Sequence, residues 1–152
     1  MELEFAKYIG TKLIKAKPMT RGEYNSYRGW KIPENENPED DGYMVVYVDS
    51  DDYVSWSPKD VFERAYRSCD GGMTFGGALE LIKMGFKVAR KGWNGKGMWL
   101  IMCHSEDYMI GPCNAADYER LPFVCMKTAD DKVVPWLASQ TDILADDWVV
   151  VK

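Results

Sequence analysis

Two segments of the chain share one residue pattern, and this repetition constrains the fold more than any other feature. The pattern is a serine, two residues, an aspartate, two apolar residues, three residues and an aromatic residue, and it covers 57–66 and 139–148. In both places a pair of aspartates and a β-type stretch precede it. Acidic residues favour turns and serine favours helix N-caps, so each segment predicts a β-hairpin followed by a short helix. We therefore expect an α+β fold of small antiparallel sheets with short helices, in two related α+β units that arose by duplication or by convergence.

The first half, residues 1–70, is predicted to form one of these units. Residues 7–18 are strand-like, and Thr20 and Glu23 have the spacing of a capping box at a helix start. Residues 42–56 predict a hairpin with acidic residues at its turn. The helix that follows is expected to have Ser57 as its N-cap and Pro58 at its first helical position.

The second half, residues 73–152, is predicted to form the other unit. Thr74 is the expected N-cap of a helix whose buried face carries Phe75, Ala78, Leu79 and Ile82, and Gly85 ends it. Residues 86–91 and 98–103 read as strands. Residues 121–136 predict a hairpin that turns at Asp130–Asp131, followed by a short helix at 139–147 and a strand at 148–151. The segment 104–120 is expected to contain a long loop.

Composition and charge exclude several classes of protein. The 152 residues carry a net charge of −5, which disfavours binding of a nucleic-acid polymer because such binding needs many cations. We expect no signal peptide and no membrane span, since no apolar run approaches about 18 residues. The four cysteines form no CxxC pair, which is typical of free thiols in a reducing cytoplasm.

The glycine-rich stretch ARKGWNGKGMW, residues 89–99, raises the question of a phosphate loop. A Walker loop needs Ser or Thr after its lysine, but Lys96 is followed by Gly97, and a strand-like segment follows in place of a helix. The Rossmann fingerprint fails for the same reason. Asn94–Gly95 is a strong two-residue hairpin signal, because both residues accept positive φ, so we predict that it closes a hairpin between the flanking strands.

A hairpin there would place Trp93 and Asn94 at its tip. The indole of Trp93 either packs on its own sheet or stacks on a planar ligand group such as a nucleobase. Asn94 offers an amide for a base or ribose edge, and the cations Arg90, Lys91 and Lys96 are within reach of a phosphate.

Other chemistry has weaker support. Cys103 and His104 are adjacent, so on a strand they face opposite sides and are poorly placed to ligate one metal ion. Nucleophilic catalysis needs a base beside the nucleophile, and the chain has a single histidine. We therefore predict no catalytic set, no metal site and no cofactor.

The segment SQTD has both a structural and a binding interpretation. Ser139 and Asp142 suit the start of a helix. The same helix start can receive a phosphate or hydroxyl, with Gln140 and Thr141 as exposed donors.

Two blocks in the second half closely resemble a family of small phage proteins, the second Thoeris anti-defense family. The blocks run from MTFGGALELIKMGF to GMWL and from MKTADDKVV to DWVVV, and their motifs ARKGWNGKGM and PWLASQTDxLAxDW are specific. They cover nearly all of residues 73–151. The first half is similar to an N-terminal extension that accompanies this domain in some phage proteins.

The resemblance implies a sponge that acts in the cytoplasm of the infected bacterium. Family members bind glycocyclic ADP-ribose, a messenger made by a host TIR-domain enzyme, without cleaving it. Some also hold cyclic dinucleotides, made by cGAS-like enzymes of CBASS systems, at a separate site. Such proteins are homo-oligomers, typically homotetramers, with ligand pockets where subunits meet. Carried onto this chain, the ligand-binding candidates are Phe75, Arg90, Lys91, Trp93, Asn94 and Trp99, with Ser139, Gln140, Thr141 and Asp142 as a second group.

Two alternatives to a sponge stay open. The first half, with Tyr24, Tyr27, Trp30 and the acidic loop 33–42, is suited to binding a host protein directly. The chain would otherwise be an enzyme that degrades the messenger.

Overall fold

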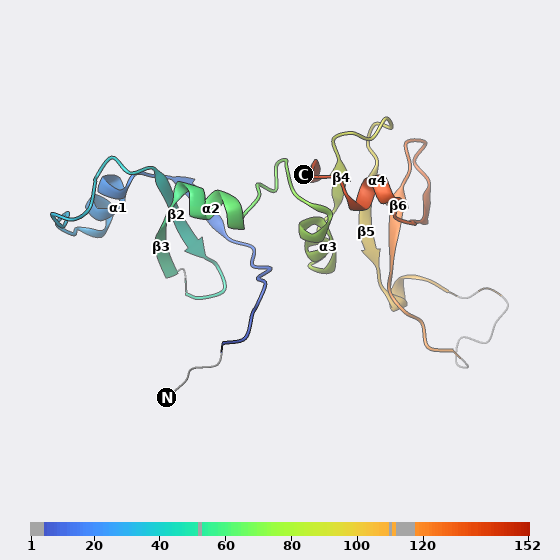
Figure 1. Ribbon diagram of the computed structural model, residues 1–152. Helices are drawn as coiled ribbons and strands as arrows, with labels where there is room; N and C mark the ends of the chain where they lie inside the picture. Colours follow the sequence, from blue (N-terminus) through green and yellow to red (C-terminus); the bar gives the residue numbers. More distant parts are fainter. Residues whose placement is uncertain (1–4, 52, 110, 112–117) are drawn as a thin grey trace. The chain divides into compact units, whose positions relative to one another are not determined.

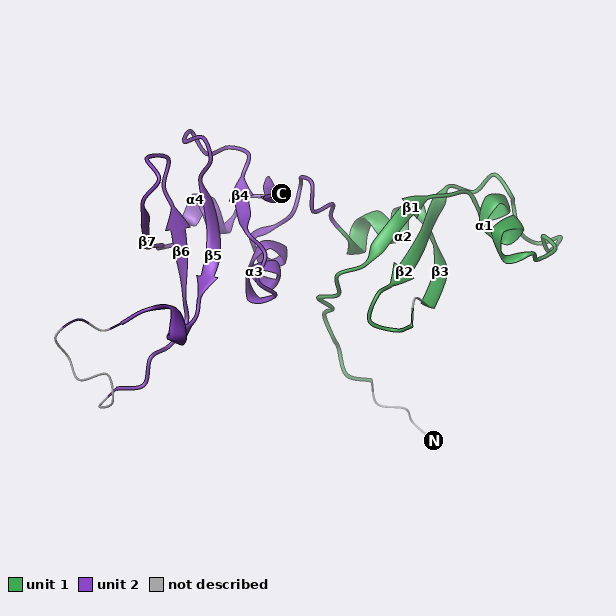
Figure 2. Ribbon diagram, turned by 180° about the vertical axis from the view of Figure 1, so that it is seen from behind, with its two compact units in different colours: residues 1–66 green, residues 67–152 purple. Residues whose placement is uncertain are grey.

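The computed structural model describes residues 5–51, 53–109, 111 and 118–152. The chain divides into two compact units, residues 1–66 and residues 67–152 (Figures 1 and 2). Each unit has its own antiparallel sheet and its own short helices. The predicted α+β class is therefore confirmed.

The first unit is built on a three-stranded sheet in the order β1-β2-β3. Strand β1 (Lys15–Pro18) pairs with β2 (Gly42–Tyr47), and β2 pairs with β3 (Tyr53–Pro58). Helix α1 (Arg21–Arg28) connects β1 to β2, and helix α2 (Lys59–Ala65) follows β3 and contacts both β2 and β3. The hairpin between β2 and β3 turns at acidic residues, as predicted, with Asp51 at a φ of 47°.

Helix α1 begins where its capping chemistry predicts. The Thr20 side chain accepts a hydrogen bond from the Glu23 N–H, and the Glu23 carboxylate accepts one from the Thr20 N–H at 2.8 Å. Gly29 ends the helix in the left-handed conformation, with a φ of 68°. The capping box is therefore confirmed.

Two predictions for the first unit are wrong. Only Lys15–Pro18 of the strand-like stretch 7–18 forms a strand, because the pairing register with β2 ends at Lys15 and Val46. Ser57 does not cap α2: it lies in β3 opposite Tyr43, and the ladder continues to Pro58, which is itself the N-cap and forms no side-chain cap bond. The sheet ladder keeps the backbone extended through both residues, so the helix starts at Lys59.

The second unit is built on a five-stranded sheet in the order β7-β6-β5-β4-β8. The strands are β4 (Val88–Arg90), β5 (Trp99–Cys103), β6 (Phe123–Lys127), β7 (Val133–Pro135) and β8 (Trp148–Val150). Each strand lies inside a segment for which the sequence predicts one. The β6–β7 hairpin turns at Asp131, which has a φ of 62°.

Helix α3 (Phe75–Lys83) packs against β4, β5 and β8 and also contacts the short helix α4 (Gln140–Ile143). Thr74 caps α3 as predicted by accepting a hydrogen bond from the Gly77 N–H, and Gly85 follows its end at a φ of 91°. Ala78 and Ile82 are buried as expected, but Leu81 rather than Leu79 completes the buried face. The side chains of Ala78, Ile82, Val88, Leu100 and Trp148 are fully buried in the core of this unit.

The segment between β5 and β6 is only partly described. It begins with a 3₁₀ turn, η1 (Ser105–Asp107). Residues 110 and 112–117 of the expected loop, Cys113 among them, lie outside the described residues. Cys69, Cys103 and Cys125 carry free thiols. None of the helices in the described part of the chain is long and apolar enough to cross a membrane.

Candidate functional site

Arg90 lies at the centre of the residues that the two family motifs bring together. It is the last residue of β4 and pairs with Trp148 of β8. Its Nε donates to Asp147 Oδ1 at 2.8 Å, and its Nη1 donates to Asp142 Oδ1 at 2.8 Å. The side chain is 18% exposed, so most of the guanidinium is enclosed by the chain itself. The guanidinium thereby joins the end of β4 to α4 through Asp142 and to the start of β8 through Asp147.

Trp93 lies just after Arg90 and shares one of its partners. The indole Nε1 donates to Asp142 Oδ1 at 3.1 Å. The ring stands edge-on against Trp148, with centroids 5.5 Å apart and an interplanar angle of 77°. Trp93 remains half-buried, so its ring is oriented by these two contacts and still reaches solvent.

Further aromatic rings surround Trp148. The ring centroid of Phe75 lies 5.5 Å from that of Trp148 and 5.9 Å from that of Trp136. The ring centroids of Trp136 and Trp148 are 6.2 Å apart. Trp148 is fully buried, and its Nε1 donates to the Asp142 carbonyl at 3.1 Å. The predicted ligand residue Phe75 therefore joins Trp93 through Trp148 in one aromatic cluster.

The SQTD segment forms the start of α4. Ser139 is the N-cap, as predicted: its Oγ accepts from the Asp142 N–H at 3.1 Å and donates to Asp142 Oδ2 at 2.7 Å. The Thr141 hydroxyl lies 2.9 Å from Ser139 Oγ. Gln140 and Thr141 are exposed, whereas Asp142 turns inward to Arg90 and Trp93.

The two aspartates are held in their charged form. Burial alone would raise the pKa of Asp142, but hydrogen bonds from Arg90, Ser139 and Trp93 outweigh it and lower the pKa below its usual range. The hydrogen bond from Arg90 is the main cause of the lowered pKa of Asp147, with the Gly92 N–H adding to it. The same bonds raise the pKa of Arg90, Asp147 first and Asp142 second. The network is therefore a fully ionised cluster at neutral pH.

The stretch that links β4 to β5 does join two antiparallel strands, but its turn is not the predicted one. Neither Asn94 nor Gly95 has a positive φ, whereas Gly97 does, at 69°. The strands end at Arg90 and start again at Trp99, so residues 91–98 form a longer loop. A Cβ on Gly95 would collide with the Met98 side chain, so the loop is closely packed at this position.

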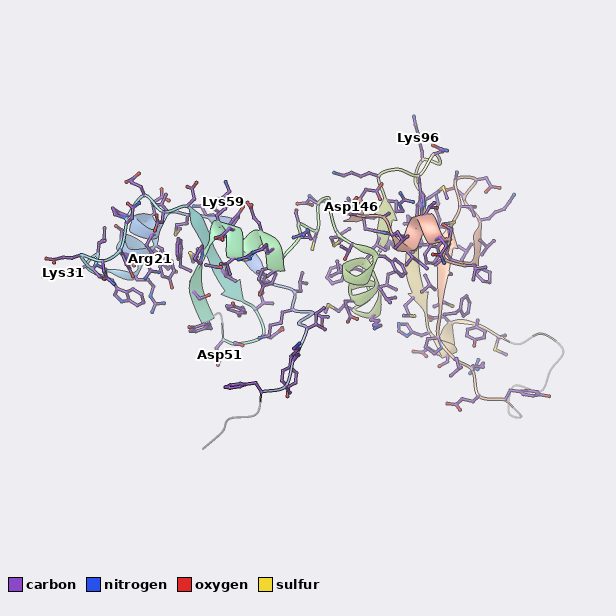
Figure 3. All side chains as sticks on the ribbon, in the orientation of Figure 1. Arg21, Lys31, Asp51, Lys59, Lys96 and Asp146 are labelled. Carbon is purple, nitrogen blue, oxygen red and sulfur yellow. The ribbon has the colours of Figure 1, made fainter. Side chains whose placement is uncertain are left out.

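The side chains of the remaining predicted residues lie outside the Arg90 network. Asn94 and Lys96 are exposed, and Figure 3 shows Lys96 pointing away from the second unit at the tip of the loop. The ammonium of Lys91 lies beside Gly71. Trp99 has the Lys87 ammonium 4.6 Å from its ring centroid. Alternation along β4 and β5 places Trp99 on the opposite side of its strand from the buried Leu100.

Sequence reasoning missed three members of the cluster: Trp136, Asp147 and Trp148. A signal for all three was present, because each is a fixed letter of the motif PWLASQTDxLAxDW. Gly92 was also missed, and its N–H donates to Asp147 Oδ2 at 2.7 Å. No local pattern marks that contact, since the two residues are far apart in the sequence.

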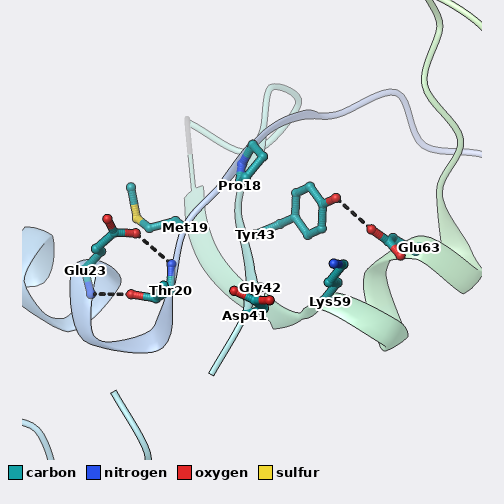
Figure 4. A pocket seen from close by; sticks show the side chains of 9 residues that line it. All are labelled: Pro18, Met19, Thr20, Glu23, Asp41, Gly42, Tyr43, Lys59 and Glu63. Carbon is teal, nitrogen blue, oxygen red and sulfur yellow. Dashed lines mark hydrogen bonds between the residues drawn. The ribbon is translucent and has the colours of Figure 1, made fainter. Parts of the chain in front are cut away.

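The first unit holds a separate pocket of about 400 Å³. Figure 4 shows its wall, where the Tyr43 hydroxyl donates to Glu63 at 2.9 Å. No residue predicted to bind ligand lies in this pocket. Its lining consists of Pro18, Met19, Thr20, Glu23, Asp41, Gly42, Tyr43, Lys59 and Glu63.

Metal chemistry finds no support in the part of the chain that the structure describes. No group of three or more His, Cys, Asp or Glu side chains there is placed to hold an ion. The arrangement around Arg90 instead offers a fixed, half-exposed indole, with an amide and a lysine on the adjoining loop. These groups suit binding of a planar, polar ligand.

Comparison with known proteins finds relatives of the second unit, which contains the Arg90 network. Residues 73–151 match the model of the Thoeris anti-defense 2-like domain. The chain is also 42% identical over 87 residues to Thoeris anti-defense 2 of Bacillus phage SP01, an alignment that covers 52% of this chain and 94% of that protein. The matched region contains the whole Arg90 network.

Proposed function

The chain belongs to the Thoeris anti-defense 2 family, and on that premise we propose that it counters Thoeris defence by binding a host nucleotide signal and holding it intact. The proposed ligand is glycocyclic ADP-ribose, with cyclic dinucleotides of CBASS systems as further ligands. The observation that carries the proposal is the half-exposed Trp93 ring, oriented by Asp142 and Trp148. A ring that is already fixed loses little conformational entropy when a base stacks on it.

The other candidate residues fit an anionic nucleotide. Asn94 offers donors and an acceptor to a base or ribose edge, and the exposed Lys91 and Lys96 offer ammonium groups to a pyrophosphate. Gln140 and Thr141 add polar groups at the start of α4. Arg90 contributes less directly, because its Nε and Nη1 already bond to aspartates.

A sponge must bind tightly enough to outcompete the host sensor. A Kd near 1 nM corresponds to about −12 kcal/mol. One stacked base contributes only about 1–3 kcal/mol, so several contacts must converge on the ligand. A homo-oligomer, proposed here as a homotetramer, would supply them by placing residues of two subunits on one ligand.

A capture-and-release experiment tests this function. The protein is mixed with glycocyclic ADP-ribose, free ligand is removed by filtration, and the protein is heated to release what it holds. We expect intact ligand in stoichiometric amount by mass spectrometry. Recovery of a cleaved product would instead indicate an enzyme, and an empty eluate would contradict the proposal.

A second candidate function rests on the first unit. Tyr27 and Trp30 are 59% and 51% exposed, and the Arg28 guanidinium lies 4.6 Å from the Trp30 ring centroid. Exposed aromatic and arginine side chains are enriched in protein–protein interfaces. Pull-down of a host defence protein without any nucleotide, lost in a Trp30→Ala variant, would favour this role.

A further inference from the structure

The first residues of the loop 91–98 form hydrogen bonds with Asp142 and Asp147. The Gly92 N–H donates to Asp147 Oδ2 at 2.7 Å, and the Lys91 N–H donates to the Asp147 carbonyl at 3.2 Å. The Trp93 indole then donates to Asp142 at 3.1 Å. Three consecutive loop residues are thus bound to a segment about fifty positions later in the chain.

Two sets of hydrogen bonds connect the Asp147 carboxylate to the loop. One carboxylate oxygen accepts from the Gly92 N–H, and the other accepts from Arg90 Nε. Arg90 in turn donates to Asp142, the acceptor of the Trp93 indole. Asp147 therefore influences Trp93 through Gly92 on the backbone side and through Arg90 on the side-chain side, without touching the ring itself.

The backbone at Gly92 packs closely against the Asp147 carboxylate. A Cβ added to Gly92 would lie 2.8 Å from Asp147 Oδ2 and 3.3 Å from Arg90 Nη2. The first of these distances is shorter than a methyl carbon and an oxygen tolerate. The backbone at residue 92 can approach the carboxylate this closely because it is glycine.

We propose that Asp147 is a positioning residue for the ligand site: it holds Gly92 and Arg90 so that the Trp93 indole stays on Asp142 and edge-on to Trp148. The inference deepens the proposed function, on which its ligand rests, while the loop geometry stands without a ligand. Asn94 follows directly at an exposed position, so its placement depends on the same anchor. Removal of Asp147 should release the Trp93 ring and leave the buried core in place.

The first arm of the test uses the free protein labelled with ¹⁵N at its tryptophan indoles. In wild type we expect the Trp93 indole N–H to be protected from exchange with solvent. Asp147→Ala should abolish that protection, while the fully buried Trp148 indole, bonded to the Asp142 carbonyl, stays protected. In Asp147→Asn the protection of the Trp93 indole should lie between that of wild type and that of Asp147→Ala. The asparagine amide oxygen still accepts from the Gly92 N–H but lacks the charge that holds Arg90.

The second arm measures affinity for glycocyclic ADP-ribose by calorimetry. Loss of a charge-assisted anchor predicts binding weaker by about tenfold in Asp147→Ala, with Asp147→Asn between that variant and wild type. Glu36→Gln is the matched control: it weakens the Arg21–Glu36 pair of the first unit and should leave both the affinity and the Trp93 indole unchanged.

The outcomes separate the two proposals. Unchanged Trp93 protection in Asp147→Ala would overturn the positioning role, and so would loss of protection at Trp148, since Asp147 would then hold the core rather than the loop. Absence of ligand binding by wild type would overturn the proposed function alone, because the indole measurement decides the positioning role without ligand.

Discussion

The indole N–H of Trp93 donates to the Asp142 carboxylate at 3.1 Å, across 49 positions of sequence. The same carboxylate oxygen accepts from Arg90, so the loop after β4 and the start of α4 share one hydrogen-bonded group. Because Trp93 is also edge-on to the buried Trp148, its ring orientation is fixed before any ligand arrives. The predictions below test this arrangement and the surrounding site.

Trp93→Phe should keep an aromatic ring at the site and lose the bond to Asp142. We expect the free energy of unfolding to fall by about 1 kcal/mol, the typical net value for one hydrogen bond, because solvent at this half-exposed site weakens the effect of the carboxylate charge. Urea denaturation measures the change. Trp99→Phe is the control and should stay within about 0.5 kcal/mol, since a phenyl ring still receives the Lys87 ammonium. Equal losses in both variants would contradict the assignment.

Gly92→Ala should destabilise the protein, because its methyl group would displace the Asp147 carboxylate. We expect a loss of about 2 kcal/mol, comparable to other disruptions of a partly buried ionic network. Gly77→Ala provides the contrast: it is an exposed helical site where a Cβ would come no closer than 3.9 Å to other atoms, and it should gain about 0.5–1 kcal/mol. Thermal unfolding of the two variants should shift in opposite directions, and a shared direction would refute the steric argument.

Acid should destabilise both units. Bonds from Arg21 and Asn25 lower the pKa of Glu36 from 4.5 to about 2, and the pKa values of Asp142 and Asp147 are also lowered in the folded state. A carboxyl whose folded pKa lies below its unfolded value stabilises the fold above the unfolded pKa, and that contribution disappears as the pH falls through the folded pKa. The unfolding midpoint should therefore be flat above about pH 5 and drop as the pH falls from 4.5 towards 2. Glu36→Gln should shrink the drop, and an unchanged pH profile in that variant would argue against the ion pair.

The helix starts at Thr20, Thr74 and Ser139 could be predicted because a capping side chain acts on its own backbone within three residues. The turn at Asp131 was predictable for a similar local reason. Local chemistry failed where a sheet or a loop decided the conformation. Ser57 carries the same local signal as Ser139, yet pairing with Tyr43 in the sheet keeps it extended.

The candidate site was predictable only in outline. The motifs marked Arg90, Trp93 and Asp142, and the structure brings these three together. Their mutual bonds were not foreseeable, because residue chemistry alone allows an arginine to bind either a phosphate or an aspartate of its own chain. Asp147 was overlooked because an acidic residue after a helix is commonly a solvated turn residue, and only the fold places it against Gly92.

Asn94→Ala should separate binding from folding. Asn94 is exposed, so stability should change by less than about 0.5 kcal/mol, while the Kd for glycocyclic ADP-ribose should rise by about tenfold. Asn94→Asp is the matched variant: it keeps the shape and adds a negative charge, so its loss should be larger at low salt and shrink at high salt. Calorimetry at two ionic strengths checks both expectations, and wild-type affinity in both variants would remove Asn94 from the site.

We propose that this chain holds a cyclic nucleotide signal on the surface formed by Trp93 and the loop of residues 91–98. Isothermal titration of glycocyclic ADP-ribose into wild type, Trp93→Phe and Trp93→Ala tests it most directly. We predict a wild-type Kd of about 1 nM, or about −12 kcal/mol, which Trp93→Phe should largely keep. Loss of the stacked ring in Trp93→Ala should raise the Kd by about 10- to 100-fold, while circular dichroism shows that the variant is still folded. No heat of binding in wild type, or the same affinity in folded Trp93→Ala, would contradict the account.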